Sequence, residues 1–159
     1  YAYGFFIEGK AMHCDEALKL PKPRPPDLPI ILVAAAALIN PRGEIFIARR
    51  PEGKSMAGLW EFPGGKVDEG ETPEFALMRE LEEELSIETR PTCYHPIAFS
   101  SHSYEDFHLL MPLFACRKWR GDITLNEHQD GAWVKPVDML DYPMPAADLP
   151  LVTTLRDSL

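Results

Sequence analysis

The sequence predicts a single α/β domain with a mixed central sheet, and three observations support this prediction. The apolar run Ile30–Ile39 is followed by a turn and a second segment, Glu44–Ala48, as expected of two buried strands. An amphipathic helical pattern begins at Pro73. Two further strand patterns, Thr92–Ser101 and Phe107–Trp119, follow it. A helix between strands along the chain is typical of domains that pack helices against a sheet.

The composition is that of a globular protein with one core. The chain has 159 residues, of which 45% are hydrophobic and 26% charged. Its net charge of −9 argues against binding to nucleic acid polymers or anionic membranes, although a small anionic substrate remains compatible if cations offset its charge. The longest apolar run is about half of a membrane span. Cys14, Cys93 and Cys116 form neither a zinc spacing nor a disulfide framework, so we expect a reducing cytoplasm.

Residues 1–29 are expected to form an N-terminal extension, and residues 30–159 the catalytic domain. Residues 10–20 show a weak helical pattern. The stretch PKPRPPDLP at 21–29 has five prolines in nine residues, which favours an extended, semi-rigid connector. A ligand for a proline-binding module is the alternative interpretation of this stretch.

The first half of the domain is expected to alternate strands and turns. Periodicity alone also permits a helix at Ile30–Ile39, but the turn signal Asn40–Gly43 favours a strand pair. Arg49 and Arg50 end the second strand, either as solvated charges or as phosphate contacts. A loop over residues 51–59 then leads to a short strand, Trp60–Phe62, and to a glycine pair that lets a ligand approach the backbone.

The second half is expected to form a strand hairpin and a final helix. Pro112 lies within the second strand pattern and predicts an edge strand or a bulge, because proline lacks the N–H that a ladder needs. The other expected elements are a turn at 104–106, a polar loop at 121–128, a strand at 131–135, a helical turn at 136–140, an irregular loop at 141–147 and a helix at 148–156.

The helix that begins at Pro73 places its side chains on distinct faces. Thr72 is a good N-cap, and proline at the first helical position loses nothing because that N–H has no helical partner. Leucines recur every four residues on an apolar stripe, while three glutamates and Arg79 lie on a neighbouring face. These side chains are Leu77, Leu81 and Leu85, and Glu80, Glu83 and Glu84. Like charges at this spacing repel, so the cluster is either a solvated acidic face or a site for a hard cation such as Mg²⁺.

The stretch Gly64–Ile87 resembles the Nudix box, G-x5-E-x7-R-E-U-x-E-E-x-G-U, in which U is aliphatic. The matching residues are Gly65, Glu71, Arg79, Glu80, Leu81, Glu83, Glu84 and Ile87. One fixed position departs, because Ser86 stands where the box has glycine. Glycine after a helix commonly takes the left-handed conformation, which costs serine about 1 kcal/mol. We therefore expect an effect on stability or on the following loop, and no loss of catalysis.

The resemblance covers roughly residues 30–157 and implies the Nudix fold, an α/β/α sandwich with a mixed central sheet. The stretch IFIARRPEGKSMAGLWEFPGGKVDEGETP is similar to the MutT branch, whose members hydrolyse oxidised nucleoside triphosphates such as 8-oxo-dGTP to the monophosphate and pyrophosphate. Relatives with the same AGLWEF segment act on CTP, dCTP or modified pyrimidine nucleotides, which is the alternative. A Nudix-like module that binds a nucleotide without hydrolysis is a remoter one.

The resemblance also implies roles for individual residues. Metal ligands would be Glu80, Glu83, Glu84, Glu127 and the Gly64 carbonyl, with Glu71 as a weaker ligand and Arg79 orienting the glutamates. Substrate contacts would come from Arg49, Arg50, Glu61, Phe62, Gly65, Lys66 and Asp148. Phe62 and Leu59 would either line the base pocket or belong simply to the core. Asp148 would contact the base edge or simply cap the last helix. The cofactor would be Mg²⁺, with Mn²⁺ as a substitute, and one glutamate, not assigned, would act as the base. We expect a monomer or weak dimer without nucleic acid or membrane partners.

Overall fold

The structure is a computed structural model that describes residues 6–7, 10–11 and 27–159. Near the N-terminus, β1 (Phe6–Ile7) pairs with β2 (Lys10–Ala11) as a short antiparallel ladder. The weak helix expected at 10–20 and the proline-rich connector lie largely outside the described residues, so the boundary at residue 30 stays a prediction. Among the residues described, no helix is long and apolar enough to cross a membrane.

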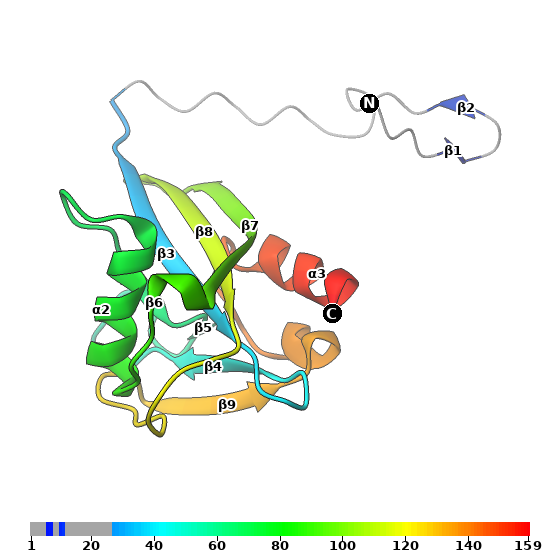
Figure 1. Cartoon of the computed structure of the whole chain (residues 1–159). Helices are drawn as coiled ribbons and strands as arrows, with labels where there is room; N and C mark the ends of the chain where they lie inside the picture. Colours follow the sequence, from blue (N-terminus) through cyan, green and yellow to red (C-terminus); the bar gives the residue numbers. More distant parts are fainter. Residues whose placement is uncertain (1–5, 8–9, 12–26) are drawn as a thin grey trace.

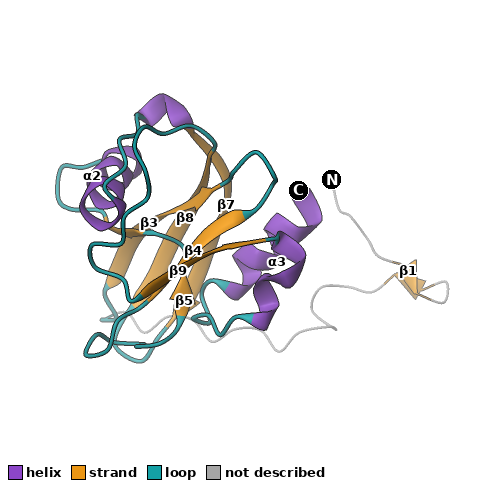
Figure 2. Ribbon diagram, turned by 90° about the horizontal axis from the view of Figure 1, so that it is seen from below, coloured by secondary structure: helices purple, strands orange, loops and turns teal. Residues whose placement is uncertain are grey.

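Two sheets lie between two helices, as Figures 1 and 2 show from two directions. Helix α2 packs on β3 and β6, and α3 packs on β7 and the short helix η2. The four-stranded sheet has the order β6-β3-β8-β7, and the three-stranded sheet has the order β5-β4-β9. This arrangement confirms the α/β/α sandwich, with its strands divided between two sheets. The bounds are β3 Ile30–Leu38, β4 Ile45–Arg49, β5 Trp60–Glu61, β6 Gly64–Lys66, α2 Pro73–Leu85, η1 Pro91–Cys93, β7 Tyr94–Ser103, β8 His108–Cys116, β9 Asp130–Val134, η2 Pro136–Asp141 and α3 Leu149–Ser158.

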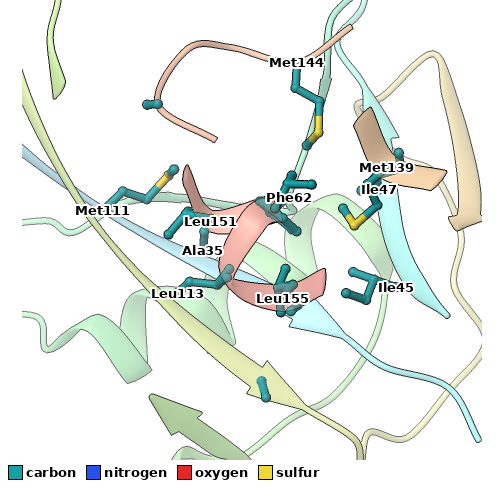
Figure 3. Packing of buried hydrophobic residues seen from close by; sticks show 14 of the residues in the cluster. Ala35, Ile45, Ile47, Phe62, Met111, Leu113, Met139, Met144, Leu151 and Leu155 are labelled. Atoms are coloured by element: carbon teal, nitrogen blue, oxygen red, sulfur yellow. The ribbon is translucent and has the colours of Figure 1, made fainter. Parts of the chain in front are cut away.

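Strand β3 is the centre of the fold, and its side chains pack on both faces of the four-stranded sheet. It runs parallel to β8 and antiparallel to β6, so the four-stranded sheet is mixed. Successive side chains of a strand point to opposite faces. Ala34 and Ala36 accordingly pack in the cluster that holds the leucine stripe of α2. Ala35 and Ala37 pack in the cluster that holds Leu151 and Leu155 of α3, several of whose members are seen in Figure 3.

The prediction that Pro112 marks an edge strand is wrong. Strand β8 lies between β3 and β7, and its far end is Cys116, three residues before the predicted end. The irregularity in the β7–β8 ladder lies in β7, between Pro96 and Ala98. On its other side, β8 is paired with β3 as far as Leu110, and the pairing resumes at Leu113. Pro112 therefore lies in an interval where the ladder is interrupted. An interior strand tolerates this proline because the ladder is interrupted where its N–H is missing.

The ends of α2 follow the sequence pattern closely. The Thr72 hydroxyl accepts a hydrogen bond from the Phe75 N–H at 3.4 Å, which confirms the N-cap. At the other end Ser86 adopts the left-handed conformation, with φ 57° and ψ 30°, and its N–H donates to the Glu82 carbonyl at 3.0 Å. The serine therefore keeps the backbone geometry that the box glycine normally provides.

Candidate active site

The glycine pair of β6 brings the sheet into direct contact with the acidic face of α2. A Cβ added to Gly64, whose φ is +148°, would lie 2.1 Å from the Ala34 carbonyl oxygen. A Cβ added to Gly65 would lie 2.2 Å from the carboxyl carbon of Glu80. The first position therefore requires glycine, because the backbone of β3 occupies the space, whereas a side chain at the second would displace the Glu80 carboxyl group.

Arg79 organises the acidic side chains around it. Its guanidinium donates to both carboxylate oxygens of Glu71 at 2.9 Å and to Glu80 at 2.6 Å. It also donates to the Lys66 carbonyl at 3.1 Å, and Glu83 lies 3.7 Å away. Hydrogen bonds from Arg79 and from the Asp68 N–H lower the pKa of Glu71 to about 2. Arg79 thus orients Glu71 and Glu80, the arrangement that the resemblance implies for it.

Glu84 is the buried carboxylate of the site. Its Oε2 accepts a hydrogen bond from the Gly64 N–H at 3.2 Å, and the residue is 8% exposed. Its pKa is raised to about 7, mainly by burial and to a lesser degree by the charges of Glu80 and Glu61, while His128 and the Gly64 N–H act to lower it. A carboxylate desolvated among other carboxylates is stabilised when a cation arrives.

The other predicted metal ligands, Glu83 and Glu127, are more exposed to solvent than Glu84. The Glu83 side chain is 54% exposed, and Glu127 forms an ion pair with Lys54 at 3.2 Å. The loop that carries Glu127 is tied to α2, because the Asn126 N–H donates to the Glu84 carbonyl at 2.9 Å. Throughout the described part of the chain, no group of three or more His, Cys, Asp or Glu side chains is already arranged to hold a metal ion. The donor set nevertheless fits Mg²⁺ or Mn²⁺, because it consists of carboxylate oxygens with a buried one at its centre. Their metal roles remain predictions.

A cavity of about 350 Å³ is lined by the glycine pair of β6 and by residues up to the start of α3. The glutamates of α2 and Glu127 are not among its lining residues, and Glu80 and Glu84 meet it only through Gly65 and Gly64. Its wall includes six of the predicted substrate contacts: Arg50, Glu61, Phe62, Gly65, Lys66 and Asp148. Gly64 also lines it. Arg49 and Leu59 are not among its lining residues, and the Arg49 Nε instead donates to the Gly58 carbonyl at 3.2 Å.

A network of charged groups surrounds Glu61, which lines the cavity. Arg50 Nη1 lies 2.8 and 3.1 Å from the two carboxylate oxygens of Glu61, and His128 Nε2 lies 3.2 Å from one of them. Asp148 is 4% exposed and makes no side-chain cap to α3, although it occupies the N-cap position. Its pKa is raised to about 8, mainly by burial and then by the charge of Glu61, while Arg50 acts to lower it. Of the two interpretations of Asp148, the side-chain helix cap is therefore wrong, and its side chain lines the cavity.

Sequence reasoning missed three side chains here. Tyr104 and Phe107 line the cavity from either side of the β7–β8 turn, and the Tyr104 hydroxyl accepts a hydrogen bond from the Ala147 N–H at 3.4 Å. The His128 side chain is 4% exposed, and its Nδ1 is buried without a hydrogen-bond partner. The one sequence signal for Tyr104 and Phe107 was that they are aromatic residues in or beside a predicted turn. His128 had no signal beyond its position next to Glu127.

Comparison with known proteins identifies the family. The NUDIX domain family pattern matches residues 34–154. The chain belongs to the Nudix family. The CTP pyrophosphohydrolase of Escherichia coli strain K12 is 39% identical over 124 residues, which cover 77% of this chain and 89% of that protein. The 8-oxo-dGTP diphosphatase of Haemophilus influenzae is 38% identical over 136 residues, which cover 81% and 93%.

Solved structures of Nudix proteins share the fold. The solution structure of the Escherichia coli ORF135 protein has a TM-score of 0.72 at 34% identity, covering 82% of this chain and 91% of that one. A MutT structure from work on Aliivibrio salmonicida and Vibrio cholerae has a TM-score of 0.67 at 35% identity, covering 82% and 99%. The chain is therefore a Nudix hydrolase, and Nudix hydrolases generally need a divalent metal.

Proposed function

We propose that this Nudix hydrolase is a magnesium-dependent nucleoside triphosphate pyrophosphohydrolase of the MutT type. It converts nucleoside triphosphates, oxidised ones such as 8-oxo-dGTP included, to the monophosphate and pyrophosphate. One observation carries the proposal: the wall of one cavity includes Gly64 and Gly65, which contact the carboxylates of α2, and also Asp148 at the start of α3. A nucleotide in this cavity can place its base near Asp148 and its phosphates beside Glu80 and Glu84.

The side chains have distinct tasks in this proposal. Glu80, Glu83, Glu84 and Glu127 would hold Mg²⁺ or Mn²⁺, which would supply positive charge for the phosphates and acidify a water molecule. One of these glutamates takes the proton of the attacking water. Arg79 holds the Glu80 carboxylate beside Gly65. Arg50, which lines the cavity and pairs with Glu61, would contact the phosphates as the resemblance implies.

The cavity near Asp148 fits a nucleobase, and the likeness to 8-oxo-dGTP diphosphatases at 36% and 38% identity makes an oxidised purine the first choice of substrate. With a pKa of about 8, Asp148 is protonated at neutral pH and can donate as well as accept a hydrogen bond. Phe62, Tyr104 and Phe107 supply aromatic walls, and the cavity of about 350 Å³ is within the range typical of small-molecule sites. The likeness to a CTP pyrophosphohydrolase, 39% identical, favours cytosine nucleotides as the second candidate.

A comparison of kcat/KM for 8-oxo-dGTP, dGTP, CTP and dCTP with Mg²⁺ tests the proposal. We expect release of pyrophosphate that stops when the metal is chelated, with the highest kcat/KM for 8-oxo-dGTP. A preference for CTP would overturn the first choice of substrate and leave the hydrolytic mechanism intact. Tight nucleotide binding by titration calorimetry, with no turnover at any divalent ion, would show a binding module instead.

We further propose a monomer or weak dimer that cleanses the nucleotide pool of the cytoplasm before DNA replication and thereby limits the need for DNA repair. The free thiols of Cys93 and Cys116 support a reducing compartment. The net charge of −9 supports a small substrate in place of a nucleic acid polymer.

Replacing Asp148 with asparagine is expected to change how stability depends on pH. Because the pKa rises from 3.8 to about 8 on folding, the stability that the neutral carboxyl contributes is complete below 3.8 and is lost as the pH rises through 8. Asparagine stays neutral, so the melting temperature of Asp148→Asn relative to the parent should increase by several degrees between about pH 4 and pH 8. The exposed Asp138→Asn is the control, and a difference that stays constant with pH would contradict this prediction.

A further inference from the structure

We propose that the Asn126 side chain is a latch that positions Glu127 for metal binding, and that Ser86 is part of this latch. The inference rests on the proposed function, because it concerns the metal role of Glu127. The Asn126 Nδ2 donates at 2.8 Å to the Glu83 carbonyl and at 2.8 Å to the Ser86 Oγ. One side chain of the loop thus contacts the last turn of α2 and the residue that ends it.

The latch gives a purpose to the one departure from the Nudix box. Glycine at position 86 would keep the left-handed backbone but would offer no hydroxyl. Serine bears the cost of that conformation, with φ 57°, and supplies a second acceptor for Asn126. The geometry therefore couples the sequence change after the helix to the loop that follows β8.

The latch acts on Glu127 because of what else holds this loop. Two backbone bonds, from the Thr124 N–H to the Leu85 carbonyl and from the Asn126 N–H to the Glu84 carbonyl, both 2.9 Å, attach the loop to the same helix end. The Glu127 carboxylate, in contrast, is 45% exposed and is held by Lys54 on another loop. Asn126 thus fixes the main chain next to Glu127 at the end of α2, so that the carboxylate has only to leave Lys54 to join Glu83 and Glu84 at a metal ion.

Binding of Mn²⁺ to the nucleotide-free protein, followed by electron paramagnetic resonance of the free ion, tests the latch without turnover. We expect Asn126→Ala to weaken Mn²⁺ binding by about tenfold, as removal of a residue that orients a ligand typically does. Ser86→Ala should weaken it by about threefold, since one of the two side-chain bonds remains. The double variant should bind Mn²⁺ as Asn126→Ala does, because the serine acts through the asparagine. Hydrogen exchange at the amides of residues 124–127 should be faster in Asn126→Ala.

Two controls separate the latch from general stability and from the proposed function. Asn40→Ala also removes an asparagine with side-chain hydrogen bonds, to Glu44 and to the Arg42 N–H, but far from the site along β3. It should lower the melting temperature and leave Mn²⁺ binding unchanged. Glu127→Gln should weaken Mn²⁺ binding at least as much as Asn126→Ala. If Glu127→Gln does so and Asn126→Ala binds like the parent, the latch is refuted and the proposed function stands. If Glu127→Gln binds like the parent, the metal role of Glu127 is refuted and the latch with it.

Discussion

Glu84→Gln is expected to lower kcat by about a thousandfold and to raise the stability of the metal-free protein. The loss follows because a metal ligand or general base is removed at the centre of the carboxylate cluster. The gain follows from burial, which raises the pKa of Glu84 from 4.5 to about 7, so that the charged form disfavours folding as the pH rises through this interval. Glutamine has no charge to desolvate, and its side-chain carbonyl oxygen can still accept a hydrogen bond from the Gly64 N–H.

Pyrophosphate release with Mg²⁺ and thermal unfolding in a chelator at pH 8 measure the two effects. Glu82→Gln is the matched control, because Glu82 lies on the same helix, its side chain is exposed, and none of the hydrogen bonds or ion pairs described above involves that side chain. It should change neither quantity appreciably. A Glu84→Gln variant that turns over as fast as the parent would refute the assignment of the catalytic centre to this face of α2.

Gly64→Ala is expected to cause the largest loss of stability. The added Cβ would lie 2.1 Å from the Ala34 carbonyl oxygen and 2.9 Å from the Ala35 Cα, and backbone cannot yield as a side chain end can. Strand β6 would have to separate from β3, and the Gly64 N–H, which donates a hydrogen bond to Glu84, would move with it. We expect a loss above about 4 kcal/mol, seen as a melting temperature lower by more than about 10 °C or as failure to fold.

Gly43→Ala separates this collision from simple backbone strain. Gly43 also has a positive φ, +75°, but a Cβ there would meet nothing within 4 Å. The control should therefore cost about 1 kcal/mol. If Gly64→Ala melted at the same temperature as Gly43→Ala, the close approach of β6 to β3 would not be essential to the fold.

Local patterns in the sequence predicted the helix and the strand pair well, because their determinants are neighbours along the chain. Thr72, Pro73 and the leucine stripe define α2 within one segment. The glutamates, Arg79 and the glycine pair were predicted together because the box motif is also one segment. The contacts between segments that are far apart along the chain were harder to predict from the sequence. Pro112 signalled an irregular ladder, but sequence could not say that β8 would be interior or that the gap would face β3.

The cavity shows the same limit. Tyr104 and Phe107 reach it only because the β7–β8 turn is brought toward the loop before α3, which no local pattern encodes. Asp148 was predicted as a site residue, but its burial and its lack of a capping bond depend on tertiary packing. The Lys54–Glu127 ion pair joins residues 73 positions apart, so no local sequence pattern could predict it either.

The alanine run of β3 has a consequence for how this enzyme can be diversified. Ala34, Ala36 and Ala37 are fully inaccessible to solvent, and Ala35 is 2% exposed, so enlargement at any of them disturbs whichever helical layer it faces. The scaffold is thus intolerant where it is most central. New base preferences are better sought in libraries that vary Tyr104 and Phe107, whose supporting turn lies at the surface, than in libraries that alter the strand beneath them.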